Sequence, residues 1–215
     1  ALPISTSTST VVINNCSITV DVKAFLQGSY AGNGSMAATL YDLGESTDPT
    51  AADSIEVSLW SAATTATASA PNYSTKVLLH TNGNASAIFP GSAVGGSYYV
   101  AIKHRNSLET WSAAPITTAS TNSVDFSASL SAAYGDGVNP PMATVGTGVY
   151  ALYSGDVNQD GSIDLLDLIG AETDASQLAF GYNATDCTGD GSSDLLDIIQ
   201  IENNAQLILF YARPY

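Results

Sequence analysis

The stretches "GDVNQDGSIDLLDL" (Gly155 to Leu168) and "TDCTGDGSSDLLDI" (Thr185 to Ile198) are two copies of one pattern, offset by 30 residues. Each copy places acidic, amide or hydroxyl residues at alternate positions, then a glycine, and closes on Leu-Leu-Asp. Neither a surface helix nor a strand requires this spacing. Alternate residues of a tightly wound loop can direct their oxygens at one centre, and a hard cation requires that arrangement.

Counting from Asp156 and from Asp186 gives each copy the features of a calcium loop. A glycine stands at position 6, where the chain must turn sharply, and position 12 falls in the first turn of a predicted helix. Because Ca²⁺ takes six to eight oxygens at about 2.3–2.6 Å, this EF-hand-like order supplies ligands for one ion per loop. Serine at position 7 would offer its backbone carbonyl. The predicted ligands of the two Ca²⁺ ions are Asp156, Asn158, Asp160, Ser162, Asp164 and Asp167 in the first loop and Asp186, Thr188, Asp190, Ser192, Asp194 and Asp197 in the second.

Other interpretations of the two loops fit less well. Solvated turns with helix-capping aspartates are the structural alternative, but a cap needs one such side chain and not five. Mg²⁺ prefers fewer protein ligands and a stricter octahedron. The second copy departs from the first at two positions, where Thr188 replaces an asparagine and Ser193 replaces an isoleucine. We therefore expect the second loop to bind its ion more weakly.

The region before the loops alternates between apolar and polar residues over short segments. Ile18, Val20 and Val22 define one face, and "SIEVSLW" and "SYYVAIKH" repeat the pattern. Short alternating runs separated by Gly, Pro and Asn predict a β-sandwich, and Asn82-Gly83 predicts a hairpin. Spacings of three and four after each loop predict helices. The expected fold is mainly β with a small α module at the C-terminus: a flexible or strand-donating arm at 1–10, a β-sandwich at 11–153, and a tandem calcium-loop module at 154–215.

The chain is strongly acidic. Its 215 residues carry a net charge of −15, and residues 151–215 hold eleven Asp and Glu against one Arg. Binding of phosphates requires Lys and Arg, which excludes a nucleic-acid partner, whereas two divalent cations would cancel four of the local charges. No stretch reaches the roughly 20 apolar residues of a membrane helix, so we expect no membrane insertion. The Ser/Thr-rich start resembles a mature N-terminus left after cleavage. With the low lysine content, it predicts a secreted, cell-surface protein.

The two cysteines, Cys16 and Cys187, fit one disulfide in an oxidising compartment. Cys187 occupies position 2 of the second loop, where its side chain should point away from the ion. We expect an intrachain bond that ties the β-domain to this loop. Two free thiols and an intermolecular bond are the alternatives.

The duplicated loops, two within about sixty residues and each with aspartate at position 12, resemble a type I dockerin module over Gly155–Pro214. The preceding stretch "GSYYVAIKHRNSLETWSA" resembles a β-domain found before such tails in Bacteroidetes-type secreted proteins. This resemblance implies calcium-dependent folding of two loop–helix units and docking onto a cohesin. Docking residues of the family sit at loop positions 10 and 11, usually as polar residues. Here these positions are Leu165-Leu166 and Leu195-Leu196.

No catalytic constellation is visible in the sequence. His104 could be joined with Asp125 or Asp136 in a His–Asp–Ser arrangement, but no nucleophile motif accompanies it, and its place on an apolar strand face favours a core histidine. Trp60 and Trp111 could form a platform for sugars, although two tryptophans in a domain of this size are usually core or rim residues. We expect a protein that is not an enzyme.

These features together predict a calcium-stabilised structural or adhesive component of the cell surface, such as a subunit of an extracellular filament. In that interpretation residues 1–14 form a strand that completes the sheet of a neighbouring copy. The expected partners are a second copy of the chain or another surface protein. Two alternatives stay open: a dockerin-type module that anchors to a cohesin-like surface scaffold, and a carbohydrate-binding module whose ligand is a polysaccharide.

Overall fold

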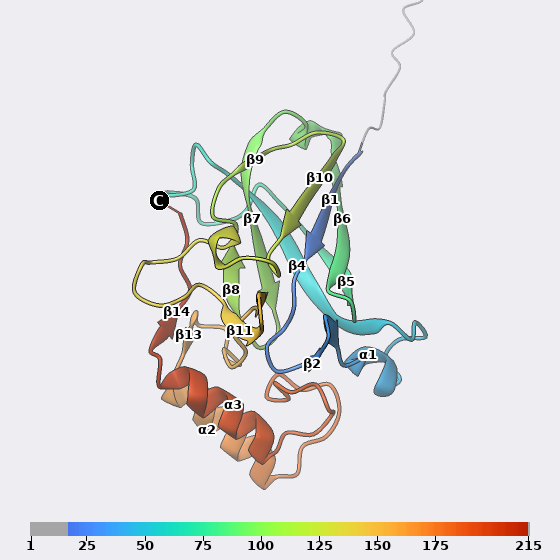
Figure 1. Cartoon of the computed structure of the whole chain (residues 1–215), viewed down its shortest axis with the longest axis vertical. Helices are drawn as coiled ribbons and strands as arrows, with labels where there is room; N and C mark the ends of the chain where they lie inside the picture. Colours follow the sequence, from blue (N-terminus) through green and yellow to red (C-terminus); the bar gives the residue numbers. More distant parts are fainter. Residues whose placement is uncertain (1–16, 215) are drawn as a thin grey trace, which may run out of the picture.

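The computed structural model describes residues 17–214, in which two β-sheets pack together and a pair of helices lies at one end (Figure 1). The predicted arm at 1–10 and Cys16 lie outside the described residues. The larger sheet has five strands and the smaller has three. The larger sheet contains β5 (Tyr73–His80), β4 (Ala51–Ser61), β7 (Ser97–His104) and β8 (Ser107–Trp111), with β9 (Ile116–Thr117) paired to β7, and the smaller contains β10 (Thr121–Asp125), β1 (Ser17–Lys23) and β6 (Asn84–Pro90).

The predicted alternation builds the core between the sheets. In β1, Ile18, Val20 and Val22 are buried while the residues between them are partly exposed. Val57 and Leu59 of β4 are also fully buried and belong to the same core cluster. Because side chains alternate across a strand, each sheet directs one apolar face inward. The mainly β architecture and the sandwich arrangement agree with the prediction.

The turn at Asn82-Gly83 does not close a hairpin, so that prediction is wrong. It joins β5 to β6, but β5 pairs with β4 in the larger sheet and β6 pairs with β1 in the smaller. Gly83 has a φ of 83°, as the turn signal anticipates. The strands on either side separate because β6 finds its partner in β1. The turn therefore connects the two sheets.

Two helices follow the two loops at the predicted places, α2 (Leu165–Ser176) and α3 (Leu195–Ala205). They lie side by side beneath the sheets (Figure 1). Residues 165–171 and 195–201 have the same order of exposed and buried positions. The remaining elements are short: β2 (Tyr30–Gly32), β3 (Ser35–Met36), α1 (Thr39–Asp42), two 3-10 turns at Gly91–Ala93 and Leu130–Ala132, β11 (Ala143–Gly146), β12 (Val149–Ala151), β13 (Ser162–Ile163) and β14 (Leu209–Phe210).

The repeat in the sequence is also a repeat in backbone pairing. In the first loop, Ser162 of β13 pairs with Phe210 of β14, which follows α3. In the second loop, Ser192 forms a bridge with Phe180, which follows α2. Each loop therefore pairs with the segment after the other helix, and the partners in the two pairs are 30 residues apart. This explains why the sequence similarity extends beyond the loops to Phe180 and Phe210.

The β-sandwich and the helix pair share a second core cluster. Leu108, Ala143 and Tyr153 of the β-domain are buried together with Ile163 and Ile201. The Tyr153 carbonyl also accepts a hydrogen bond from the backbone N–H of Leu108 at 2.8 Å, just before the first loop begins. The last strand thus leads straight into the loop, and the two parts pack as one body. Among the described helices, none is both long and apolar enough to span a membrane.

Candidate metal centre

The first loop, residues 156–167, is wound by hydrogen bonds from its own backbone to its polar side chains. Asn158 Oδ1 accepts from the Asp160 N–H at 2.8 Å, and Asp160 Oδ1 accepts from the Ser162 N–H at 3.0 Å. Asp167 Oδ1 accepts from the N–H groups of Val157 and Asn158 at 2.9 and 3.2 Å. Position 12 of the loop therefore folds back onto positions 2 and 3, and the loop closes on itself.

Two positions in each loop also cap the following helix. Asp164 accepts from the Leu166 N–H at 2.8 Å, and Asp167 accepts from the Asp164 N–H at 2.9 Å. Asp194 and Asp197 form the same capping box at the start of α3. The capping interpretation therefore accounts for positions 9 and 12. It gives no role to the polar residues at positions 1, 3 and 5.

Asp156, at position 1 of the first loop, is the least satisfied of these carboxylates. It is 2 % exposed, and its Oδ1 has no hydrogen-bond partner. Burial, followed by the negative charges of Asp167 and Asp160, raises the pKa of Asp156 to about 7. A buried carboxylate without a partner is costly, and a neighbouring cation would remove much of that cost.

In the second loop, residues 186–197, the equivalent carboxylate is better satisfied. Asp186 is fully buried, and it accepts from the N–H groups of Gly189 at 2.7 Å and Gly191 at 3.2 Å. Arg105 of the β-domain places Nη2 3.8 Å from Asp186 Oδ2. Burial raises the pKa of Asp186 to about 6, and the charge of Arg105 opposes that rise. A cation from the protein itself thus stands beside this loop.

The two loops are also covered by different parts of the chain. Thr39 of α1 donates from Oγ1 to the Gly189 carbonyl at 2.7 Å. A Cβ added to Gly191 would lie 2.6 Å from Leu43, so the β-domain presses directly on the second loop. In the first loop, a Cβ on Gly161 would lie 2.5 Å from the ring of Tyr211, near the C-terminus. The second loop is therefore an interface with the sandwich, and the first is closed by the tail.

Arg105 is the centre of a buried charge network that the sequence did not predict. Its Nε donates to Asp53 Oδ2 at 3.2 Å, and its guanidinium lies 4.5 Å from the centre of the Tyr182 ring. It also donates to the Asn183 carbonyl, and Tyr182 donates its hydroxyl to Asp53. Burial alone would raise the pKa of Asp53, but contacts with His104 and Arg105 hold it at about 2. These contacts join β4, the turn after β7 and the entrance to the second loop.

His104 belongs to this network and not to a catalytic site. Its Nε2 lies 3.1 Å from Asp53 Oδ2, and its Nδ1 lies 2.9 Å from Ser107 Oγ. All three residues are buried, and Ser107 is 0 % exposed, so its hydroxyl cannot meet a substrate. Asp125 and Asp136, the partners considered for His104, accept hydrogen bonds from residues two positions further along the chain instead. His104 is therefore the core histidine that its strand position predicts.

Asn106 links the two loops, and sequence reasoning also missed it. Its Nδ2 donates to the Asp186 carbonyl at 2.8 Å, and its own carbonyl accepts from the Gly155 N–H at 2.7 Å. Asn204 of α3 adds a second link, since its Nδ2 donates to Gln27 Oε1 at 2.7 Å and to the Ser154 carbonyl at 2.6 Å. Both asparagines are buried. The sequence did not single out these two asparagines, because each partner lies 49 or more residues away in the chain.

The donor chemistry of the loops fits a hard cation. Within residues 17–214, no three His, Cys, Asp or Glu side chains form a metal-holding group by themselves. The predicted sets also draw on an amide, a hydroxyl and backbone carbonyls, and every donor is oxygen, as Ca²⁺ prefers. The unpartnered Asp156 oxygen is the structural feature that fits an ion most closely. Of the two loops, the first would therefore be stabilised more by a bound ion.

The structure does not support the predicted disulfide. Cys187 is buried in the second core cluster, has no disulfide partner within residues 17–214, and lies against Gly28. Its expected partner, Cys16, lies outside the described residues. Burial also raises the pKa of the Cys187 thiol.

Trp60 and Trp111 do not form an exposed platform. Their ring centres are 4.9 Å apart, and both side chains are buried. The guanidinium of Arg213 lies 5.7 Å from the Trp60 ring centre and 6.0 Å from that of Trp111. The pair is thus covered by the C-terminal segment, and this arrangement gives no support to a polysaccharide ligand.

The outer sides of α2 and α3 are apolar and exposed. Leu165 and Leu166 are 64 % and 61 % exposed, and Leu195 and Leu196 are 66 % and 58 % exposed. Ile169 and Ile199 continue each face by one helical turn and are exposed as well. We call these residues the LLxxI faces. The leucines sit at loop positions 10 and 11, so the resemblance to dockerins had singled them out.

Comparison with known proteins does not assign the chain to a family. No family model matches the chain, and no curated protein matches it. Matching solved structures include chains from two interface mutants of a type II cohesin–X–dockerin complex from Acetivibrio cellulolyticus. Both are 16 % identical and cover 87 % of this chain and 94 % of the solved chain, with TM-scores of 0.46 and 0.44. A likeness at this level supports no conclusion about function or partner.

Proposed function

We propose that this chain is a secreted, non-catalytic attachment module. Two calcium loops organise α2 and α3, and the helices fasten the β-sandwich to a partner protein at the cell surface. This proposal takes up the dockerin-type alternative, and the filament interpretation stays a prediction because its strand-donating arm lies outside the described residues. The observation that carries the proposal is the pair of exposed LLxxI faces.

Six large apolar side chains stand in solvent on two short helices. Exposed apolar clusters of this kind are typical of protein interaction sites in soluble proteins. Burying one leucine is worth about 1.5–3 kcal/mol, so either face could contribute substantially to binding. Both faces have the same LLxxI pattern and similar exposure, which indicates that the repeat preserves a surface and not only a fold.

Calcium would serve this surface by fixing where each helix begins. Asp164 and Asp167 are at once predicted ligands and caps of α2, and Leu165 and Leu166 lie between them in the sequence. Ca²⁺, when bound, supplies the positive charge that the buried carboxylates lack. The chain's own residues then hold the first turn of the helix, and with it the leucines, in place. Asp194 and Asp197 have the same two roles for α3.

The charge around these faces restricts the partner. Residues 151–215 have a net charge of −10, which two calcium ions would reduce to −6. A surface with complementary potential is apolar at its centre and neutral or basic at its rim. We therefore propose a protein partner of the cohesin kind, with an apolar docking surface and few acidic residues around it.

Retention on immobilised, purified cohesin modules tests this function. The intact chain is passed over the modules in calcium and in EDTA, beside the double variant Leu165→Ser/Leu195→Ser. Ile88→Ser is the matched control, because Ile88 is 64 % exposed on β6, outside the helix pair. We expect calcium-dependent retention that the double variant weakens more than tenfold and the control leaves unchanged. Retention that survives both EDTA and the double variant, or no retention of the intact chain on any module, would reject the proposal.

A further inference from the structure

The last described residues, 211–214, connect the first loop with the β-sandwich. They follow β14 without regular secondary structure and run from the helix pair alongside the sheets (Figure 1). Pro214 is buried, and Arg213 is only partly exposed. We call this segment the C-terminal tail. It has contacts at both ends and in the middle.

At the near end, the tail is bound to the first loop. The Tyr211 N–H donates to the Gly161 carbonyl at 2.9 Å, directly after β14 has paired with β13. The Tyr211 ring packs so closely on Gly161 that a Cβ there would collide with it. Asp160 and Ser162, both predicted calcium ligands, are the neighbours of that glycine. Any movement of the first loop is therefore transmitted to the tail.

At the far end, the tail is bound to the sandwich through Arg213. Its Nη2 donates to the carbonyls of Thr65 and Ala68 at 2.9 and 3.1 Å. The same guanidinium lies near the ring faces of Trp60 and Trp111. A guanidinium over two indoles is a favourable cation–π arrangement, and the chain has only two arginines. The tail is therefore held to the sandwich by the contact of Arg213 with the tryptophan pair.

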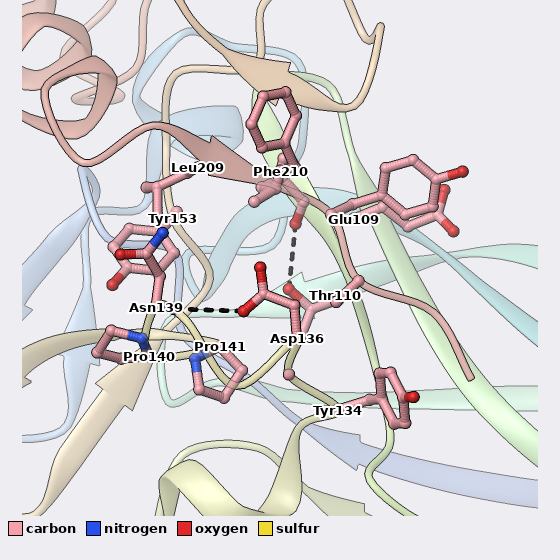
Figure 2. Close-up of a pocket in the computed structure, with 14 residues that line it drawn as sticks. Glu109, Thr110, Tyr134, Asp136, Asn139, Pro140, Pro141, Tyr153, Leu209 and Phe210 are labelled. Atoms are coloured by element: carbon pink, nitrogen blue, oxygen red, sulfur yellow. Dashed lines mark hydrogen bonds between the residues drawn. The ribbon is translucent and has the colours of Figure 1, made fainter. Parts of the chain in front are cut away.

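Between its two ends, the tail places Ala212 at a small pocket over the loop at residues 134–141, which the preceding residues Leu209 and Phe210 also line. Figure 2 shows the small pocket here, with Leu209 and Phe210 on one side and Pro140, Pro141 and Tyr134 on the other. Asn139 donates from Nδ2 to the Leu207 carbonyl at 3.2 Å, which fixes the chain before it reaches the pocket.

We propose that the C-terminal tail is a latch that couples the ion at the first loop to the tryptophan pair of the β-sandwich. With Ca²⁺ in the first loop, β13 stays in register with β14, and Arg213 stays in contact with Trp60 and Trp111. Without the ion, repulsion among the clustered carboxylates loosens the loop, and Arg213 loses this contact. This inference rests on the calcium loops of the proposed function but not on their docking partner.

The second loop supplies an internal control. Its equivalent of the tail contact is the Gly181 N–H, which donates to the Gly191 carbonyl at 2.9 Å. That contact belongs to the segment between the helices and has no connection to the tryptophans. Asp160→Ala and Asp190→Ala therefore remove the same position from the two loops, but only the first should disturb the tail.

Tryptophan emission reads the latch directly, because Trp60 and Trp111 are the only tryptophans in the chain. The chelated full chain is titrated with Ca²⁺ and followed by emission and by calorimetry. We expect an emission change in the wild type and in Asp190→Ala, and its loss in Asp160→Ala and in Arg213→Gln. Arg213 is not a predicted ligand, so Arg213→Gln should fold, keep both ions and bind the one at the first loop about fivefold more weakly, by reciprocity of coupling.

The outcomes separate the latch from the function on which it rests. If calorimetry shows calcium binding to both loops while the emission stays constant, the latch is wrong and the calcium loops stand. If Arg213→Gln gives the emission change of the wild type, or if Asp160→Ala and Asp190→Ala behave alike, the latch is also wrong. Absence of calcium binding to the wild type would overturn the proposed function and the latch together.

Discussion

The two loops have similar sequences and the same capping box at the following helix, yet they lie in different surroundings. The second is pressed against the β-domain by Thr39 and Leu43 and has Arg105 beside Asp186. The first is covered by Tyr211, and its Asp156 has an oxygen without a partner. Local sequence determines how each loop winds, and the rest of the chain determines what each loop lacks. In the first loop the charge of Lys103 only weakly opposes the raised pKa of Asp156, whereas in the second loop Arg105 lies 3.8 Å from Asp186.

This difference indicates two roles. The second loop is a joint that holds the helix pair to the sandwich, and it keeps several contacts that do not involve an ion. The first loop holds fewer such contacts and should respond more strongly to calcium. The sequence also predicts weaker calcium binding by the second loop, from Thr188 and Ser193. It does not reveal the contacts with the β-domain that the structure adds as a reason.

Replacing Arg105, which holds the second loop to the sandwich, should lower the free energy of unfolding more than the other changes described below. Arg105→Gln leaves Asp53 and Asp186 buried without their cation, and loss of one partner from a buried ion pair costs about 3–5 kcal/mol. Lys76→Gln is the control, since Lys76 is a β5 cation outside this network. Urea unfolding measures both. A loss below about 1 kcal/mol for Arg105→Gln would show that the network does not hold the two parts together.

Acid should weaken the same joint by a smaller amount. Asp53 has a folded pKa of about 2 against an ordinary value of 3.8. A depressed pKa contributes stability above the unfolded value, and that contribution is lost as the pH falls from about 4 through 2. The loss amounts to about 2 kcal/mol.

Unfolding free energies at pH 6 and at pH 2.5 measure this loss in the wild type and in Asp53→Asn. The variant should lose less stability on acidification than the wild type. Equal losses in the two proteins would mean that Asp53 does not carry the acid sensitivity.

Replacing the glycine at position 6 of each loop should have the smallest effect on stability, and it compares the two loops at one matched position. Gly161 and Gly191 have φ values of 89° and 86°, where an alanine is strained. Each change to alanine should cost about 1 kcal/mol or more. Gly161→Ala also displaces Tyr211 and should alter tryptophan emission, whereas Gly191→Ala displaces Leu43 and should not. The same emission spectrum for both variants would show that the tail does not distinguish the loops.

Much of the fold could be predicted from local patterns. Alternation predicted β1 and β4, and three- and four-residue spacing predicted α2 and α3, because both signals lie within a few consecutive residues. The Asn-Gly turn was misread as a hairpin because a turn does not reveal which strand its neighbours pair with. Register and partner choice depend on the whole sheet.

The positions of the two loops before α2 and α3 could be predicted from the sequence, but the surroundings of the loops could not. The ligands that alternate oxygens and a glycine indicate stay a prediction. The contact of Arg105 with Asp186 joins residues 81 positions apart, and no periodic signal connects them. The cysteine pairing stays a prediction because Cys16 lies outside the described residues, and the burial of Cys187 against Gly28 could not be predicted because it depends on tertiary packing.

The shift of the thermal midpoint between calcium and EDTA tests the central claim most directly. Binding to the folded state alone adds about 4 kcal/mol at a thousandfold excess of Ca²⁺ over its Kd. We predict a clearly higher midpoint in calcium, and a shift that Asp156→Ala reduces more than Asp186→Ala does. An identical midpoint in calcium and EDTA for the intact chain would contradict the account.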